Sequence, residues 1–153
     1  MRHVIQTHYL SSVYEPEEFQ KTVKNSLKRI RQFMRTKDGQ FDAIAFTGTS
    51  GAAMAYIIAH KLNVGLICIR KDKSSHYKGK VEGVRNAKKY IIIDDFIDSG
   101  NTIGSILDSV KVFSPKAKCS GIFLYDEEYD DIYKWSRIVN SKNKESIKIY
   151  ACG

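Results

Sequence analysis

Cysteine and proline are scarce in this sequence. The three cysteines, Cys68, Cys119 and Cys152, are an odd number at scattered positions, and none belongs to the CxxC or Cys/His spacing that a zinc site needs. A reducing compartment suits such a chain best. The two prolines, Pro16 and Pro115, mark no linker, and no internal repeat or low-complexity tract divides the chain.

Long apolar runs are missing as well. No segment approaches the roughly 20 apolar residues that span a bilayer, and the opening residues, MRHVIQTHYLSS, lack the apolar run of a signal peptide. We therefore expect a cytoplasmic protein with no membrane attachment. Because domains usually contain roughly 100 to 200 residues, the 153 residues favour a single domain over 1–153 and argue against an enzyme with a cleft between two domains.

Acidic residues are outnumbered by basic ones. Lys and Arg number 25 and Asp and Glu 17, which leaves a net charge of +8. An excess of this size on a small protein indicates an anionic partner, and composition leaves open whether that partner is nucleic acid, a membrane or a small phosphate. With 42% apolar and 27% charged residues, the chain is typical of soluble globular proteins and unlike disordered or collagen-like ones.

Apolar runs of strand-like composition alternate with helical patterns. After Pro16, apolar residues recur at spacings of three and four and predict an amphipathic helix that ends near 37–39. Further helices are expected at 52–62 and after residue 102. The predicted strands are 43–46, 64–69, 90–94 and 121–125. Buried strands separated by such helices indicate an α/β fold, with a mainly parallel twisted sheet flanked by helices, as in Rossmann-like proteins.

Ligands of such a sheet bind in the loops at the carboxyl ends of its strands. In this sequence the corresponding loops are 47–51, 70–83, 94–102 and the residues just after 125. Their side chains are therefore the candidates for binding and catalysis.

Two adjacent carboxylates, Asp94 and Asp95, close the apolar run at 90–94. Carboxylates accept hydrogen bonds from vicinal hydroxyls and attract a divalent cation. An acidic pair at the carboxyl end of a buried strand therefore suits a sugar, bound directly or through Mg²⁺.

The turn DSGNT at 98–102, which leads from this pair into a helix, is suited to an anion. Gly100 permits a tight or left-handed backbone, amide groups converge at the helix start, and the hydroxyls of Ser99 and Thr102 add donors. A simple helix cap with a solvated turn is the other interpretation. It leaves the carboxylates beside the turn unexplained, whereas a ribose phosphate would use both the acidic pair and the turn.

The segment YIIIDDFIDSGNTI at 90–103 resembles the phosphoribosyl-diphosphate (PRPP) signature of type I phosphoribosyltransferases, and the resemblance covers roughly 40–125. It implies that family's fold, with a small hood, and Mg²⁺-dependent transfer of the 5-phosphoribosyl group from PRPP to a nitrogenous base, orotate or a purine. Diphosphate would be released. By this resemblance Asp94 and Asp95 bind the ribose hydroxyls and the metal. The residues implied to wrap the 5′-phosphate are Asp98, Ser99, Gly100, Asn101 and Thr102.

The segment TGTSG follows the first predicted strand, where the family has its pyrophosphate loop. Its residues are Thr47, Gly48, Thr49, Ser50 and Gly51. The family commonly has Lys or Arg before the loop glycine, so with Thr47 there the contacts to diphosphate would come from amides and hydroxyls. A glycine-rich turn in which Ser50 caps the next helix is the alternative.

A basic segment covers 70–89, with eight basic residues against two acidic ones. Such a loop suits a mobile cover over a polyanion better than a DNA-binding face, although a solvated charge run remains an alternative for 78–89. The run RKDKSSH resembles the catalytic loop of orotate members, with Lys73 one position short of that pattern's lysine. The catalytic residues that the resemblance implies are Arg70, Lys71, Lys73, His76 and Asp98, the last facing the base.

The expected partners are PRPP, a nucleobase-like acceptor and a second copy, because members of the family commonly pair. Aromatic residues at 126–135 could stack on the base or form one buried face of a surface helix. A second functional class stays open, a non-catalytic PRPP- or nucleotide-binding regulator that contacts RNA or DNA through the basic excess, although a nucleic-acid partner is the less favoured expectation. A phosphatase is disfavoured because Asp94-Asp95-Phe96 lacks the D-x-D spacing.

Overall fold

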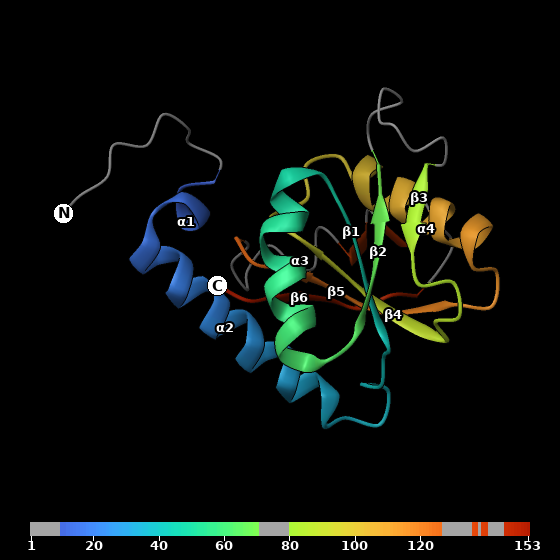
Figure 1. The fold of residues 1–153 in the computed structure, drawn as a ribbon, viewed down its shortest axis with the longest axis horizontal. Helices are drawn as coiled ribbons and strands as arrows, with labels where there is room; N and C mark the ends of the chain where they lie inside the picture. Colours follow the sequence, from blue (N-terminus) through green and yellow to red (C-terminus); the bar gives the residue numbers. More distant parts are fainter. Residues whose placement is uncertain (1–9, 71–79, 127–135, 138, 141–145) are drawn as a thin grey trace.

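The computed structural model describes residues 10–70, 80–126, 136–137, 139–140 and 146–153. The helices with both ends in these ranges are α1 (Ser11–Tyr14), α2 (Pro16–Met34), α3 (Gly48–Leu62) and α4 (Asn101–Phe113), and residues 136–137 and 139–140 are also helical. The strands are β1 (Ala43–Thr47), β2 (Gly65–Ile69), β3 (Val81–Gly83), β4 (Lys89–Asp94), β5 (Lys118–Leu124) and β6 (Ile149–Ala151). The six strands form one sheet in the order β3-β2-β1-β4-β5-β6 (Figure 1).

The sheet is mainly parallel, which confirms the predicted α/β architecture. Strand β1 pairs in parallel with both β2 and β4, and β4, β5 and β6 continue in parallel. Only β3 runs antiparallel, against β2. The chain builds outward from β1 to one edge and then from β4 to the other, so the strand order reverses between β1 and β4. Ligands bind at such a reversal, outside the carboxyl ends of the strands.

Helices cover both faces of the sheet, and the alternating side chains of β4 separate two apolar cores (Figure 1). Ile91 and Ile93 pack with residues of α2 and α3. Tyr90 and Ile92 pack on the opposite face with residues of α4. Because each face buries apolar side chains, the strand is apolar at successive positions rather than at alternate ones.

Several element boundaries differ from the sequence prediction. Helix α2 begins at Pro16, where the Glu15 side chain accepts a hydrogen bond from the N–H of Glu18, but it ends at Met34, short of the predicted 37–39. Helix α3 begins at Gly48 rather than residue 52. Most of the predicted turn at 47–51 is therefore the first turn of a helix, because small polar residues and glycine occur at helix starts as well as in turns.

None of the three cysteines, all within the described residues, forms a disulfide. Cys68 and Cys119 are partly buried and Cys152 is buried. Burial raises the pKa of the Cys152 thiol to about 12, so this group stays protonated at neutral pH. Across the described ranges, no helix combines the length and apolar character that crossing a membrane requires. The cytoplasmic location stays a prediction.

Candidate active site

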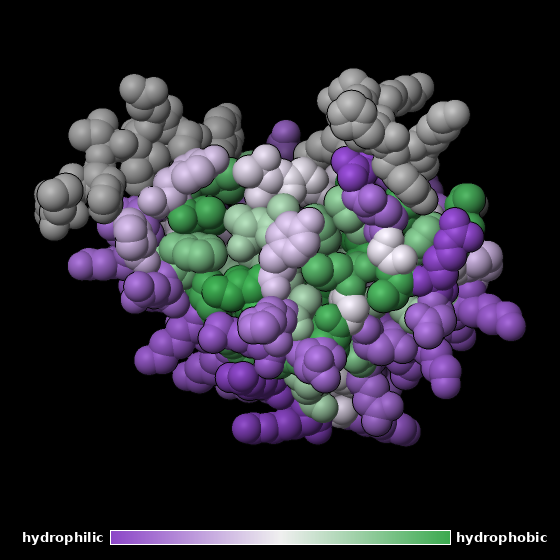
Figure 2. All heavy atoms as spheres, viewed as in Figure 1, coloured by the Kyte–Doolittle hydropathy of each residue, from purple (hydrophilic) through white to green (hydrophobic). Residues whose placement is uncertain are grey.

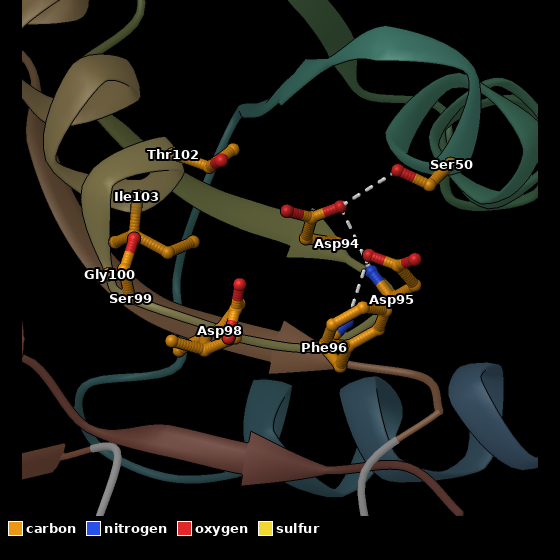
Figure 3. A pocket seen from close by; sticks show the side chains of 10 residues that line it. Ser50, Asp94, Asp95, Phe96, Asp98, Ser99, Gly100, Thr102 and Ile103 are labelled. Atoms are coloured by element: carbon orange, nitrogen blue, oxygen red, sulfur yellow. Dashed lines mark hydrogen bonds between the residues drawn. The ribbon is translucent and has the colours of Figure 1, made fainter. Parts of the chain in front are cut away.

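A cavity of about 260 Å³ lies where the strand order reverses. Its walls come from the first turn of α3, the end of β4 and the segment that leads into α4 (Figure 3). The described residues that line it are Ser50, Asp94, Asp95, Phe96, Ile97, Asp98, Ser99, Gly100, Thr102 and Ile103. Six of the residues predicted from the segment 94–102 thus surround one cavity.

The acidic pair forms one wall of this cavity and is almost completely buried. The exposed fractions are 4% for Asp94 and 8% for Asp95. Asp94 Oδ1 accepts hydrogen bonds from Ser50 Oγ at 3.2 Å and from the Asp95 N–H at 3.0 Å. Asp95 Oδ1 accepts one from the Phe96 N–H at 2.9 Å (Figure 3). These donors orient both carboxyl groups.

Burial gives the pair unusual electrostatics. Removal from water and, next, the negative charge of Asp95 raise the pKa of Asp94 to about 7, against the opposing effect of the hydrogen bonds from the Asp95 amide and Ser50. Burial also raises the pKa of nearby Asp126. Two carboxylates so close in a poorly hydrated site repel each other, so hydroxyl donors or a cation would stabilise their ionised forms.

The opposite wall is the turn into α4. Gly100 precedes the helix in a left-handed conformation, with φ of 82°, and the Gly104 N–H donates to its carbonyl at 3.0 Å. Amide groups before that first helical hydrogen bond have no carbonyl partner within the helix, and the helix dipole adds positive potential there. Figure 3 shows Gly100 and Thr102 across the cavity from Asp94. The turn therefore borders open space large enough for a phosphoryl group.

Only part of the turn faces the cavity. Asp98 and Ser99 line it and are themselves exposed. Asn101 begins α4, is exposed and does not belong to the lining, and its N–H donates to Ser99 Oγ at 3.3 Å.

The segment predicted as a pyrophosphate loop contributes one residue to the lining, Ser50. The hydroxyl of buried Thr47 is engaged elsewhere, since it donates to the Ile69 carbonyl at 2.6 Å. Gly48 adopts φ of 67° at the start of α3, and Thr49 is exposed. The fifth residue of the segment, Gly51, does not line the cavity and instead packs against the sheet.

That residue, Gly51, sets how closely α3 approaches the sheet. A Cβ atom at Gly51 would lie 3.0 Å from the Cβ of Phe46 and 3.4 Å from the carbonyl oxygen of Ile93. The helix start therefore lies directly against β1 and β4, which brings Ser50 within hydrogen-bond distance of Asp94.

Tyr125 is a site residue that the sequence did not indicate. It follows β5 and is 3% exposed. Its hydroxyl donates to the Ser50 carbonyl at 2.7 Å, and its N–H donates to the Asp94 carbonyl at 3.1 Å. The sequence showed only an apolar run that ends in tyrosine, so no local signal could have linked this residue to a turn 75 positions away.

The basic segment is described only at its ends. Arg70 follows β2, its N–H donates to the Lys80 carbonyl at 2.8 Å, and its guanidinium forms an ion pair with Glu82. Arg70 is not among the residues that line the cavity. Lys71, Lys73 and His76 lie outside the described residues, as do the aromatic residues expected to contact a base at 127–135. Their roles stay predictions.

The donor set of the site fits a cation that arrives with a phosphorylated substrate. Within the described ranges, no three His, Cys, Asp or Glu side chains gather closely enough to hold a metal ion by themselves. Asp94 and Asp95 offer two carboxylates, and Mg²⁺ is often bound by one or two carboxylates together with substrate phosphates. The residues present are therefore compatible with Mg²⁺ shared between protein and substrate.

The fold and the cavity define an α/β protein with an acidic, phosphate-sized site at the reversal of strand order. Residues 12–151 match the model of the phosphoribosyl transferase domain, and the chain belongs to this family. It is 29% identical over 98 residues to the orotate phosphoribosyltransferase of Staphylococcus haemolyticus, covering 61% of this chain and 46% of that protein. The chain spans less than half the length of the curated relatives that it matches.

Solved structures share the fold at low sequence identity. The orotate phosphoribosyltransferase from Aeropyrum pernix superposes with a TM-score of 0.63 at 10% identity, over 98% of this chain and 77% of its own. The adenine phosphoribosyltransferase from Thermoanaerobacter pseudethanolicus gives 0.59 at 15% identity, over 87% and 80%. Proteins named for a pyrimidine and for a purine thus share this architecture, so the fold does not select the base.

Replacement of Asp94 by asparagine is expected to stabilise the protein at alkaline pH. The Asp94 carboxyl has a pKa of about 7 in the fold against 3.8 ordinarily. The protonated Asp94 carboxyl group therefore makes its full contribution to the free energy of unfolding below about pH 4, and this contribution is lost as the pH rises through 7. Asp94→Asn avoids this loss, so we expect its free energy of unfolding to exceed that of the wild type by about 2 kcal/mol at roughly pH 8.

Urea titrations at roughly pH 8 and pH 4.5 measure this difference, which should shrink at the lower pH. Asp98→Asn, at an exposed position of the same site, serves as the control. Equal stabilities of Asp94→Asn and wild type at both pH values would contradict the electrostatic description.

Proposed function

We propose that the chain is a phosphoribosyltransferase that moves the 5-phosphoribosyl group of PRPP to a nitrogenous base and releases diphosphate. The observation that carries this proposal is one cavity lined by the buried pair Asp94 and Asp95 and by the turn that begins α4. Carboxylates suit vicinal sugar hydroxyls, and a helix start suits a phosphate. A ribose phosphate requires both kinds of group in one site.

Orotate is the acceptor that we propose first, and a purine is the second. The curated relatives named above are orotate phosphoribosyltransferases, and Arg70, Lys71 and His76 fit the catalytic-loop pattern of that type. Because an adenine phosphoribosyltransferase shares the fold, a purine stays the second candidate for the acceptor.

Each wall of the cavity has a proposed role. Asp94 and Asp95 accept hydrogen bonds from the ribose hydroxyls, and the turn at 98–102 holds the 5′-phosphate. The first turn of α3, which includes Ser50, donates hydrogen bonds to the diphosphate through its amides and hydroxyl. For Arg70 and the basic residues that follow it in the sequence, we propose a supply of positive charge to the diphosphate.

The reaction that we propose is a displacement at C1 of the ribose. A nitrogen of the base forms a bond to C1, the bond from C1 to the diphosphate oxygen breaks with its electron pair, and the proton lost by the base passes to Asp98 or solvent. No covalent enzyme intermediate is required. The carboxylates of Asp94 and Asp95 favour the positive charge that develops on the ring. Mg²⁺, held by these carboxylates and the substrate, would offset the charge on the departing diphosphate.

A homodimer is the assembly that we propose. The outer face of α3 carries partly exposed apolar side chains at Ala52 and Ile57, with Tyr56 at 57% exposure. Figure 2 shows apolar surface on the face of the molecule where α3 lies, bordered by hydrophilic side chains. Continuous apolar surface with a polar border is typical of protein contacts.

The variant Tyr56→Lys tests the dimer. A charge in the middle of an apolar contact lacks compensation, so we expect the variant to sediment as a monomer at concentrations where the wild type is a dimer. Val112→Lys, at an exposed apolar residue of α4, is the matched control and should leave the dimer intact. A monomeric wild type, or an unchanged Tyr56→Lys dimer, would contradict the proposal.

The double variant Asp94→Asn with Asp95→Asn tests PRPP binding. Loss of two acceptors and two charges is expected to weaken PRPP binding by about a hundredfold or more in the presence of Mg²⁺. Isothermal titration calorimetry measures the affinity, and thermal unfolding shows that the variant remains folded. Unchanged PRPP affinity would show that the acidic pair does not bind the substrate.

Turnover with a panel of bases tests the activity itself. We expect diphosphate release from PRPP and Mg²⁺ in the presence of orotate or, as the second candidate, a purine. PRPP binding without turnover of any base, combined with salt-sensitive RNA binding, would favour the regulator instead. That alternative is kept because the net charge of +8 would also serve phosphate contacts to a nucleic acid.

A further inference from the structure

Tyr125 connects three segments of the site through hydrogen bonds. Its N–H donates to the carbonyl of Asp94 at the end of β4, and its hydroxyl donates to the carbonyl of Ser50 in the first turn of α3. Ser50 Oγ in turn donates to Asp94 Oδ1. The three residues therefore form a closed ring of hydrogen bonds that joins β4, β5 and α3.

Within this ring, a bound ligand would not compete for the hydrogen bond that the Tyr125 hydroxyl donates. Asp94 Oδ1 and Ser50 Oγ both border the cavity, so a bound substrate would compete for the bond between them. The Tyr125 hydroxyl is not part of the cavity lining, and its side chain is buried. When a ligand takes over the Asp94 carboxylate and the Ser50 hydroxyl, both bonds made by Tyr125 remain, and the bond from its hydroxyl is the one that still holds Ser50.

The chemistry of the Tyr125 hydroxyl suits a permanent donor. Burial raises its pKa above the ordinary value for tyrosine, and the carboxylates of Asp95, Asp126 and Asp94 raise it further. The hydroxyl therefore keeps its proton at neutral pH, and its hydrogen bond of 2.7 Å to the Ser50 carbonyl is strengthened by the low hydration of the buried side chain.

We propose that Tyr125 is a positioning residue that fixes the distance between the first turn of α3 and the acidic pair, and thereby sets the affinity for the diphosphate part of the substrate. The inference rests on the proposed function, in which this turn of α3 binds diphosphate. The turn at 98–102 lies across the cavity from Ser50 (Figure 3), so we expect binding of the 5′-phosphate not to depend on the bond that Tyr125 makes to Ser50.

The variant Tyr125→Phe separates these two effects because it removes the hydroxyl and keeps the ring. We expect the affinities for PRPP and for inorganic diphosphate to fall by about fivefold or more, the effect of one hydrogen bond. The affinity for ribose 5-phosphate, which has no diphosphate, is expected to remain unchanged. Calorimetric titration of the full chain with each of the three compounds and Mg²⁺ gives the comparison.

Tyr150→Phe is the matched control, since this tyrosine is partly buried on β6 and stacks on Phe123 at 4.8 Å between ring centroids. It should leave all three affinities unchanged. Equal PRPP affinities of Tyr125→Phe and wild type would overturn this inference and leave the proposed function standing. A parallel loss for ribose 5-phosphate would also overturn it, because this pattern indicates a general structural role. A wild type that binds no PRPP would overturn the proposed function and this inference together.

Discussion

The site depends on two carboxyl groups buried side by side at the end of β4. Asp94 and Asp95 are both more than nine-tenths buried, and the first has a pKa near neutrality because water is excluded and its neighbour is negative. Such a pair destabilises a folded protein whenever both groups are ionised. The surrounding structure nevertheless supplies donors from Ser50 and from the following backbone that hold the pair in place. A bound cation would relieve the repulsion, and hydroxyl donors would stabilise the charged carboxylates.

Two helix starts complement this negative charge. The first turn of α3 and the turn before α4 both border the cavity at the carboxyl edge of the sheet. Each presents amide groups and the positive end of a helix dipole. The site is therefore acidic where a sugar ring would lie and rich in donors where phosphates would lie. This division of charge, more than any single side chain, supports the proposal that the ligand is a phosphorylated sugar.

The long, strongly patterned elements were predicted well, and the short ones were not. Strand β4 follows the predicted run at 90–94 closely, because a strand buried on both faces is apolar at nearly every position. Strands β3 and β6 have three residues each and exist by pairing with β2 and β5. Such short strands carry no periodic pattern of their own. The start of α3 was misplaced because Gly48–Gly51 has the composition of a turn.

The chemistry that is local in the chain could be inferred from the residues alone. Asp94, Asp95 and the turn at 98–102 lie within nine consecutive residues, so strand end, acidic pair and helix start could be recognised together. The folded arrangement was needed to show that Ser50, 44 positions away, donates to Asp94, and that Tyr125, 75 positions beyond Ser50, donates to the start of α3. The physical reason is the topology of the sheet, which brings the carboxyl ends of β1, β4 and β5 to one edge. No local pattern encodes which side chains meet there.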